Sequence, residues 1–196
     1  MPINIGPNPN LTFTNPLGWL RGCHDRIKHF LGLLTLVATR RQGGELHRED
    51  REALDAALRY FREAFPKHTE DEEQSLFPRM RRSTLPAAVA ARAPLDLLEN
   101  EHHAIDQIHA EVDLLVERWL TEGALPAFEG GRLIALLQQL QGFYEKHIAM
   151  EDREVFSVAS VVLTEKEMIE IGREMALRRG IDPDLAIAYP MNVSGR

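Results

Sequence analysis

The sequence contains a single cysteine, Cys23, among its 196 residues. One cysteine excludes an intrachain disulfide framework and any metal site built from cysteines alone. The chain also lacks a basic amino-terminal region followed by an apolar segment, and it has no long uncharged apolar run. We therefore expect neither a secretory leader nor a membrane span, and we expect a cytoplasmic protein.

Positive charge is in deficit, because 23 lysines and arginines stand against 30 aspartates and glutamates and leave a net charge of −7. This balance argues against nucleic acid or an anionic membrane surface as the main partner. The sequence also lacks a glycine-rich phosphate loop and a nucleophile–base constellation. The sequence therefore gives no support to a function as a hydrolase or a nucleotide-dependent enzyme.

The alternation of polar and apolar residues that marks strands is missing as well. Apolar residues instead recur every three or four positions, which is typical of amphipathic helices. Because the connections between the helices are short, the sequence predicts an all-α protein whose core is an antiparallel, up-down-up-down four-helix bundle. The four long helices are expected to begin at Asn15-Pro16, near His47, near Leu95 and at Pro126.

The two ends of the chain are predicted to lie outside the bundle. Residues 1–14 are rich in Asn and Pro and indicate an extended arm. Thr164-Glu-Lys-Glu167 is a capping box that starts a fifth helix, which should end at Arg178-Arg179-Gly180. The expected organisation is an arm (1–14), a four-helix bundle (15–162), and a C-terminal extra helix and tail (163–196).

Histidine is the chemically informative residue type, with eight copies in the chain. Two segments share the pattern Lys-His-x-x-x-Glu followed by a second acidic residue, and both have a Phe nine residues after the His. They contain His68 with Glu72, and His147 with Glu151. On a helix, residues four apart lie on one face with Cβ atoms about 5–6 Å apart, so each pair can present an imidazole and a carboxylate to one metal ion.

These motifs belong to an internal repeat. A lone histidine in the apolar seam of the preceding helix comes before each motif, His24 before His68 and His102 before His147, at separations of 44 and 45 residues. Each half of the chain is therefore a helical hairpin. Packed about an approximate two-fold axis, the hairpins would direct four imidazoles and two carboxylates into one interior.

Two interpretations of that interior differ in their electrostatics. Burying two ionised glutamates without partners would cost several kcal/mol each or force them neutral. A multivalent cation removes this cost, whereas the alternative is a pair of buried His–Glu hydrogen bonds. If both glutamates bridge, six side chains supply about eight bonds, while two five- or six-coordinate ions need about ten to twelve.

A bridging oxo or hydroxo ligand and one or two open positions would complete such a two-ion centre. Mixed imidazole and carboxylate ligation with open positions suits iron best, and manganese next. A single structural zinc ion prefers four closed ligands and would leave two of the six side chains unused.

The order of a lone His, His-x-x-x-Glu, a lone His and again His-x-x-x-Glu resembles the hemerythrin-like (HHE cation-binding) domain over about residues 16–160. The segments that carry the resemblance are His68-Thr-Glu-Asp-Glu72-Glu-Gln-Ser-Leu-Phe-Pro78, Glu101-His102 and His147-Ile-Ala-Met-Glu151-Asp. It implies a non-haem di-iron centre inside a four-helix bundle. The implied terminal ligands are His24, His68, His102 and His147, and the implied bridges are Glu72 and Glu151.

One position departs from the oxygen-carrying members of that family, which have a fifth histidine one helical turn after the third-helix ligand. Asp106 stands there in this chain. The substitution puts simple reversible O2 carriage in doubt and suggests a more open iron. Asp106 could coordinate the metal directly or act on a ligand without touching the metal.

Two further histidines lie near the predicted ligands. His103 competes with His102 for the third-helix position. The 44-residue separation in the first half favours His103, whereas the helix phase favours His102, and we rely on the phase because it sets side-chain direction. His109, two turns along the same seam, is either a satisfied core histidine or part of a channel.

Tyr144 and Cys23 also adjoin predicted ligands. Tyr144 lies one turn before His147, where it either packs with its hydroxyl satisfied or donates a hydrogen bond to a bound oxygen species. Cys23 precedes His24 and is either a small buried residue or a reporter of redox state or nitric oxide.

Together these features predict a di-iron protein that binds, senses or reacts with O2, NO or peroxide. A second hypothesis is an iron–sulfur cluster repair or iron-donor protein, although the short polar arm stands where such relatives often carry a cysteine-bearing module. A third is a metal-dependent regulatory module in which the fifth helix and tail respond to the metal. The fifth helix could equally form the contact of a homodimer.

Overall fold

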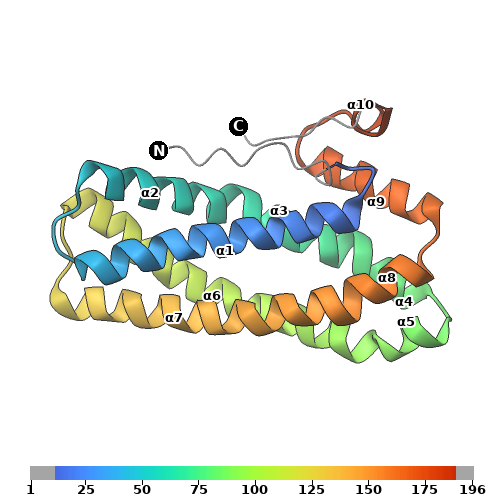
Figure 1. Cartoon of the computed structure of the whole chain (residues 1–196), viewed down its shortest axis with the longest axis horizontal. Coiled ribbons are helices and arrows are strands. Elements are labelled where there is room, and N and C mark those ends of the chain that lie inside the picture. Colours follow the sequence, from blue (N-terminus) through green and yellow to red (C-terminus); the bar gives the residue numbers. More distant parts are fainter. Residues whose placement is uncertain (1–11, 189–196) are drawn as a thin grey trace. The chain divides into compact units, whose positions relative to one another are not determined.

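The computed structural model describes residues 12–188, and this part of the chain consists of helices, turns and loops without a strand (Figure 1). The all-α class that the apolar spacing predicts is therefore confirmed. Residues 1–11 of the predicted arm and residues 189–196 of the predicted tail lie outside the described range. None of the helices between residues 12 and 188 is long and apolar enough to cross a membrane.

The helical elements fall into three groups. The longer α-helices are α1 (Pro16–Arg41), α2 (Arg48–Arg59), α6 (Arg92–Glu122), α7 (Ala127–Met150) and α9 (Glu165–Arg178). The short ones are α3 (Phe65–Glu70), α4 (Phe77–Arg82), α5 (Pro86–Ala90), α8 (Phe156–Val162) and α10 (Pro183–Ala188). Three segments are π-helical: η1 (Tyr60–Ala64), η2 (Asp71–Leu76) and η3 (Glu151–Val155).

Several helix ends follow the chemistry that the sequence indicates. The side-chain oxygen of Asn15 accepts a hydrogen bond from the Gly18 backbone at 3.0 Å and so caps α1. Gly43, with φ of 81°, follows the other end of α1 in the left-handed region that glycine tolerates. The Thr164 hydroxyl accepts from the Glu167 backbone at 3.2 Å, and the Glu167 carboxylate accepts from the Thr164 backbone at 2.8 Å. The predicted capping box of α9 is therefore confirmed.

The predicted second helix is less regular than its apolar seam indicates. It consists of α2, η1, α3, η2 and α4 in succession. A π-turn closes hydrogen bonds over five residues instead of four, as between the Phe65 N–H and the Tyr60 carbonyl at the end of η1. Pro66 lies just after this π-turn, so two known causes of helix bending, a proline and a π-turn, coincide here.

Two other boundaries differ from the expectation. The third long helix begins at Arg92, so Pro94 lies inside its first turn, where a missing N–H leaves no hydrogen bond unmade. Within the predicted tail, Pro183–Ala188 forms the additional short helix α10.

The described chain divides into two compact units, each assembled from separate stretches. The first unit contains residues 12–24, 67–95 and 152–188, and the second contains residues 25–66 and 96–151. The predicted boundaries after residues 14 and 162 stay predictions.

The second unit has a hydrophobic core to which α1, α2, α6 and α7 all contribute. Its fully or nearly fully buried members include Leu34, Leu54, Val116, Trp119 and Leu137. The Trp119 indole N–H donates to the Gly44 carbonyl at 2.9 Å, so its one polar atom is satisfied inside this core. A core shared by four helical segments is typical of a bundle, and the up-down-up-down order stays a prediction.

In the first unit, α9 packs against η2 and against α10 (Figure 1). It also approaches the turn before α1 very closely. A Cβ added to Gly172 would lie 1.8 Å from the carbonyl oxygen of Phe13. Phe13 itself is buried and stacks on Trp19, with ring centroids 4.4 Å apart.

We expect Gly172→Ala to lower the free energy of unfolding by about 1–3 kcal/mol, because the added methyl group would force α9 away from the Phe13 carbonyl. Gly142→Ala is the control, since that exposed helical glycine has open space around its Cβ position. The control should be neutral or more stable by up to about 1 kcal/mol. Urea unfolding measures both, and equal stability of the two variants would contradict the close contact.

Candidate metal centre

His24, His68 and Glu72 form a buried triad in the first unit. Each histidine is 2% exposed and Glu72 is fully buried. The two imidazole centroids lie 5.2 Å apart with the rings almost perpendicular, and His68 Nε2 lies 3.7 Å from Glu72 Oε1. One potential ligand atom from each residue lies within 4.8 Å of the other two. A single cation can therefore be held by two nitrogens and one carboxylate here.

Two residues of the same unit orient the His24 ring. Its Nδ1 lies 3.6 Å from Asp152 Oδ1, and its ring stacks on Phe156 with centroids 5.4 Å apart. At this distance the carboxylate acts on Nδ1 electrostatically and not through a direct hydrogen bond. Phe156 is the Phe that follows His147 by nine residues in the repeated motif, so the structure gives this repeated residue a packing role.

His102, His147 and Glu151 form the corresponding triad in the second unit. Each histidine is 3% exposed and Glu151 is fully buried. The two Nε2 atoms face each other at 3.1 Å. Glu151 Oε1 lies 3.0 Å from His147 Nε2 and 3.8 Å from His102 Nε2. Two nitrogens and a carboxylate again converge on one small region.

Glu101 completes the surroundings of His147. Its Oε2 lies 2.8 Å from His147 Nδ1, so the imidazole N–H donates there and Nε2 is left as the electron-pair donor. The sequence places Glu101 beside His102 without indicating this contact. No spacing rule reveals it, because the residues lie on different helices, 46 positions apart.

All six predicted ligands thus belong to one triad or the other, three in each unit, while ligation itself stays a prediction. Of the His102–His103 pair, His102 is buried and belongs to the second triad, and His103 is exposed. Asp106 is exposed and, within residues 12–188, belongs to neither group of closely spaced ligand atoms. Cys23 is buried, as expected of a small core residue.

Both glutamates lie in the first two residues of π-turns, which a regular helical periodicity does not predict. Glu72 is the second residue of η2, where its carbonyl accepts from the Phe77 N–H, and Glu151 is the first residue of η3. π-turns occur frequently at functional sites. A signal does exist in the sequence, since each seam takes two successive steps of four residues, from His68 to Leu76 and from His147 to Val155. Each such step drifts about 40° around a regular α-helix, and a wider turn absorbs the drift.

Tyr144, which is buried, and His109, which is half-buried, form a polar pair in the second unit. The Tyr144 hydroxyl lies 2.7 Å from His109 Nε2, and the His109 ring packs against Phe61 and Phe65 at centroid distances of 4.5 and 5.2 Å. Burial lowers the pKa of His109 to about 4 and raises the pKa of Tyr144 well above its usual value. Both groups are therefore neutral near pH 7. A role of Tyr144 toward a bound oxygen species stays a prediction.

The donor set fits a redox-active or Lewis-acidic cation. Each triad offers two imidazole nitrogens and one carboxylate, and this mixture suits iron and manganese better than the hard cations that prefer oxygen ligands alone. A cation held there also compensates the charge of a fully buried glutamate.

Comparison with known proteins agrees with this chemistry. The family model described as the hemerythrin HHE cation binding domain matches residues 15–159, a range that contains both triads. A protein of Haemophilus influenzae that carries the name "Uncharacterized protein" is 23% identical over 177 residues, which cover 90% of this chain and 97% of that protein.

The depressed pKa of His109 predicts a specific acid sensitivity. Between the ordinary value of 6.5 and about 4, the unfolded chain binds a proton at this residue and the folded chain does not. Stability is therefore lost as the pH falls through this window, by about 2–3 kcal/mol at pH 4.5.

His109→Gln keeps a hydrogen-bonding group beside Tyr144 and cannot be protonated, so its stability should fall less between pH 7 and pH 4.5. The exposed His103→Gln serves as the control and should follow the wild type. Urea unfolding in the presence of a chelator measures the difference. Parallel pH dependence of wild type and His109→Gln would contradict the low pKa.

Proposed function

Because the chain belongs to the hemerythrin HHE cation binding family, we propose that it binds two iron ions through its two triads and that this iron binds, senses or reacts with O2, NO or peroxide. The observation that supports this most is the pair of buried triads, each with two imidazoles and one fully buried carboxylate. One such group is a common polar core. Two of the same composition, one from each half of a repeated sequence, favour a two-ion centre.

The proposed ligand roles follow the halves of the repeat. His24 and His68 would hold one ion and His102 and His147 the other, and the family resemblance implies that Glu72 and Glu151 would serve as bridges. These six side chains supply about eight of the ten to twelve bonds that two five- or six-coordinate ions need, so positions remain for an oxo or hydroxo bridge and for a small ligand. Manganese is the next candidate and zinc the last, since zinc prefers four closed ligands.

The bound iron supplies the redox chemistry, and the protein supplies orientation and a dry environment. Glu101 accepts the Nδ1 proton of His147, so that ring offers Nε2 to the metal, and Asp152 lies 3.6 Å from Nδ1 of His24. Asp106 stands where oxygen carriers of the family have a fifth histidine, and it leaves the neighbouring ion more open. A sensing or reactive role is therefore favoured over reversible O2 carriage.

Metal content tests the binding part of the proposal. Wild-type protein loaded anaerobically with Fe(II) should retain about two iron ions per chain after desalting, in line with the ligand count. Glu72→Ala and Glu151→Ala should each lose most of this iron. Glu154→Ala is the control, because Glu154 is an exposed glutamate in the same π-turn as Glu151. Wild-type protein that retains no iron, with a helical circular dichroism spectrum, would refute the proposal.

Optical spectroscopy tests the reactive part. On exposure of the iron-loaded protein to O2, we expect the near-ultraviolet charge-transfer absorption of an oxo-bridged di-iron centre. Parallel samples treated with NO and with peroxide identify which ligand the centre prefers. A spectrum that stays unchanged with all three would reject reaction with these molecules, while the iron content would still report on binding.

A further inference from the structure

Two consecutive arginines at the C-terminal end of α9 converge on Asp71, the residue that precedes Glu72. Arg178 Nη1 donates to Asp71 Oδ1 at 2.8 Å, and Arg179 Nη2 donates to Asp71 Oδ2 at 2.7 Å. Arg179 Nη1 also reaches Oδ1 at 3.2 Å. Asp71 is fully buried, so both of its oxygens are held by guanidinium groups away from water.

The contact continues along η2 and α4. Arg178 Nη2 donates to the hydroxyl of the buried Ser75 at 2.6 Å. Arg79 donates to Glu174 of α9 at 2.8 and 3.0 Å and to the Ser75 carbonyl at 2.9 Å. Asp71, Ser75 and Arg79 follow one another at steps of four, so α9 holds one continuous edge of the segment that carries Glu72.

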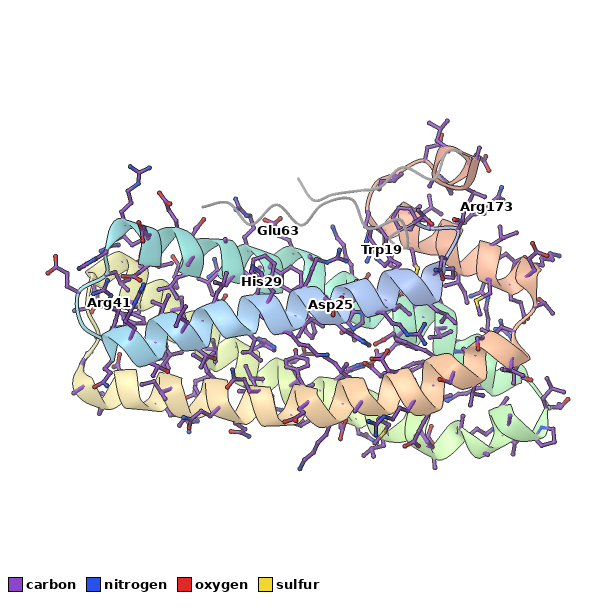
Figure 2. The ribbon with its side chains drawn as sticks, viewed as in Figure 1. Trp19, Asp25, His29, Arg41, Glu63 and Arg173 are labelled. Atoms are coloured by element: carbon purple, nitrogen blue, oxygen red, sulfur yellow. The ribbon has the colours of Figure 1, made fainter. Side chains whose placement is uncertain are left out.

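Arg179 also reaches the other end of the first triad's scaffold. Its guanidinium carbon lies 5.1 Å from the Trp19 ring centroid and 6.0 Å from that of Phe13. Trp19 lies on α1, five residues before His24, and Figure 2 shows it near α9. One helix thus contacts both elements that supply His24 and Glu72.

We propose that α9 is a clamp on the first triad, and that Asp71, held by Arg178 and Arg179, is a positioning residue for Glu72. This inference rests on the proposed binding of metal by His24, His68 and Glu72. The backbone hydrogen bonds of a π-turn close a wider ring than those of an α-helix and constrain its residues less. The two guanidinium groups therefore fix the first residue of the turn from outside the helix.

Coupling of this kind acts in both directions. If docked α9 raises the metal affinity of the triad by some factor, bound metal favours docking of α9 by the same factor. Loss of metal therefore loosens α9 and gives solvent access to its buried face, which includes Ile171, Met175 and Ala176. The presence or absence of metal at a buried centre would then change which residues of α9 are exposed at the protein surface.

The first test measures Co(II) affinity by competition with a chelator. Arg179→Met should weaken binding about 10- to 100-fold, as expected for loss of a group that orients a ligand. Arg173→Met is the matched control, because Arg173 is also on α9 but pairs with the exposed Asp184 of α10 at 2.6 Å (Figure 2). The control should keep wild-type affinity.

Two further readouts separate positioning from general stability. The ligand-field absorption of Co(II) should change in Arg179→Met, because a displaced Glu72 alters the coordination, and it should be unchanged in Arg173→Met. In a double-mutant cycle, the effects of Asp71→Asn and Arg179→Met should be clearly less than additive, since the two residues share a contact even though Arg178 also holds Asp71.

Hydrogen exchange of the wild-type protein tests the coupling between metal binding and the docking of α9 even if Arg179→Met does not fold. Amides of residues 71–76 and of residues 165–178 should both exchange more slowly with Co(II) bound. Protection of 71–76 alone, or equal Co(II) affinity of Arg179→Met and Arg173→Met, would overturn the clamp while metal binding stands. A wild-type protein that binds neither Co(II) nor Fe(II) would overturn the proposed function together with the clamp.

Discussion

The placement of a fully buried carboxylate between two buried imidazoles is the interaction on which the rest of this structure depends. It occurs twice, at Glu72 and at Glu151. An ionised carboxylate that leaves water costs several kcal/mol unless positive charge or strong hydrogen bonds replace the lost hydration. A cation meets this requirement with the donor types that the triads offer. The apolar seams of the helices, the orienting carboxylates and the ionic contacts of α9 can all be understood as support for these two groups.

Acidic residues outside the triads lie next to two of the imidazoles. Glu101 fixes the proton of His147, and Asp152 lies beside the corresponding nitrogen of His24. At His147 the hydrogen bond from Nδ1 leaves Nε2 as the electron-pair donor, whereas the contact at His24 is a 3.6 Å electrostatic one. The His147 imidazole is thus oriented before any ion arrives, which lowers the reorganisation that binding requires.

Much of this organisation could be predicted from the sequence, because it depends on periodicity. The seam spacing identifies the helical class, and it predicts an inward direction for the lone histidine of each half and for His102 rather than His103. Contacts between distant segments could not be predicted in this way. Glu101 with His147, Tyr144 with His109, and Asp71 with Arg178 and Arg179 are pairs 35 to 108 residues apart. These contacts form through the packing of one helix against another. The apolar spacing of a helix indicates only which of its faces is turned inward.

The π-turns occupy an intermediate position between these two cases. The double steps of four residues after His68 and His147 carry the signal, but a regular helix with a slight supercoil tolerates similar spacing. The hydrogen bond from the Phe77 N–H to the Glu72 carbonyl resolves the ambiguity in favour of a wide turn.

The wide turn at Glu72 has a consequence for how this helix can vary in length. Relative to a regular α-helix, η2 accommodates one extra residue, so an excision of one residue between positions 71 and 76 would restore ordinary winding. The residues beyond it would keep their faces, because the wide turn absorbs the extra residue without turning the rest of the helix. The fully buried Leu76, Phe77 and Met80 would stay in the interior, whereas one residue removed from a regular α-helix turns everything beyond it by about 100°. This segment can therefore lose one residue at the wide turn without turning its hydrophobic anchor out of the core.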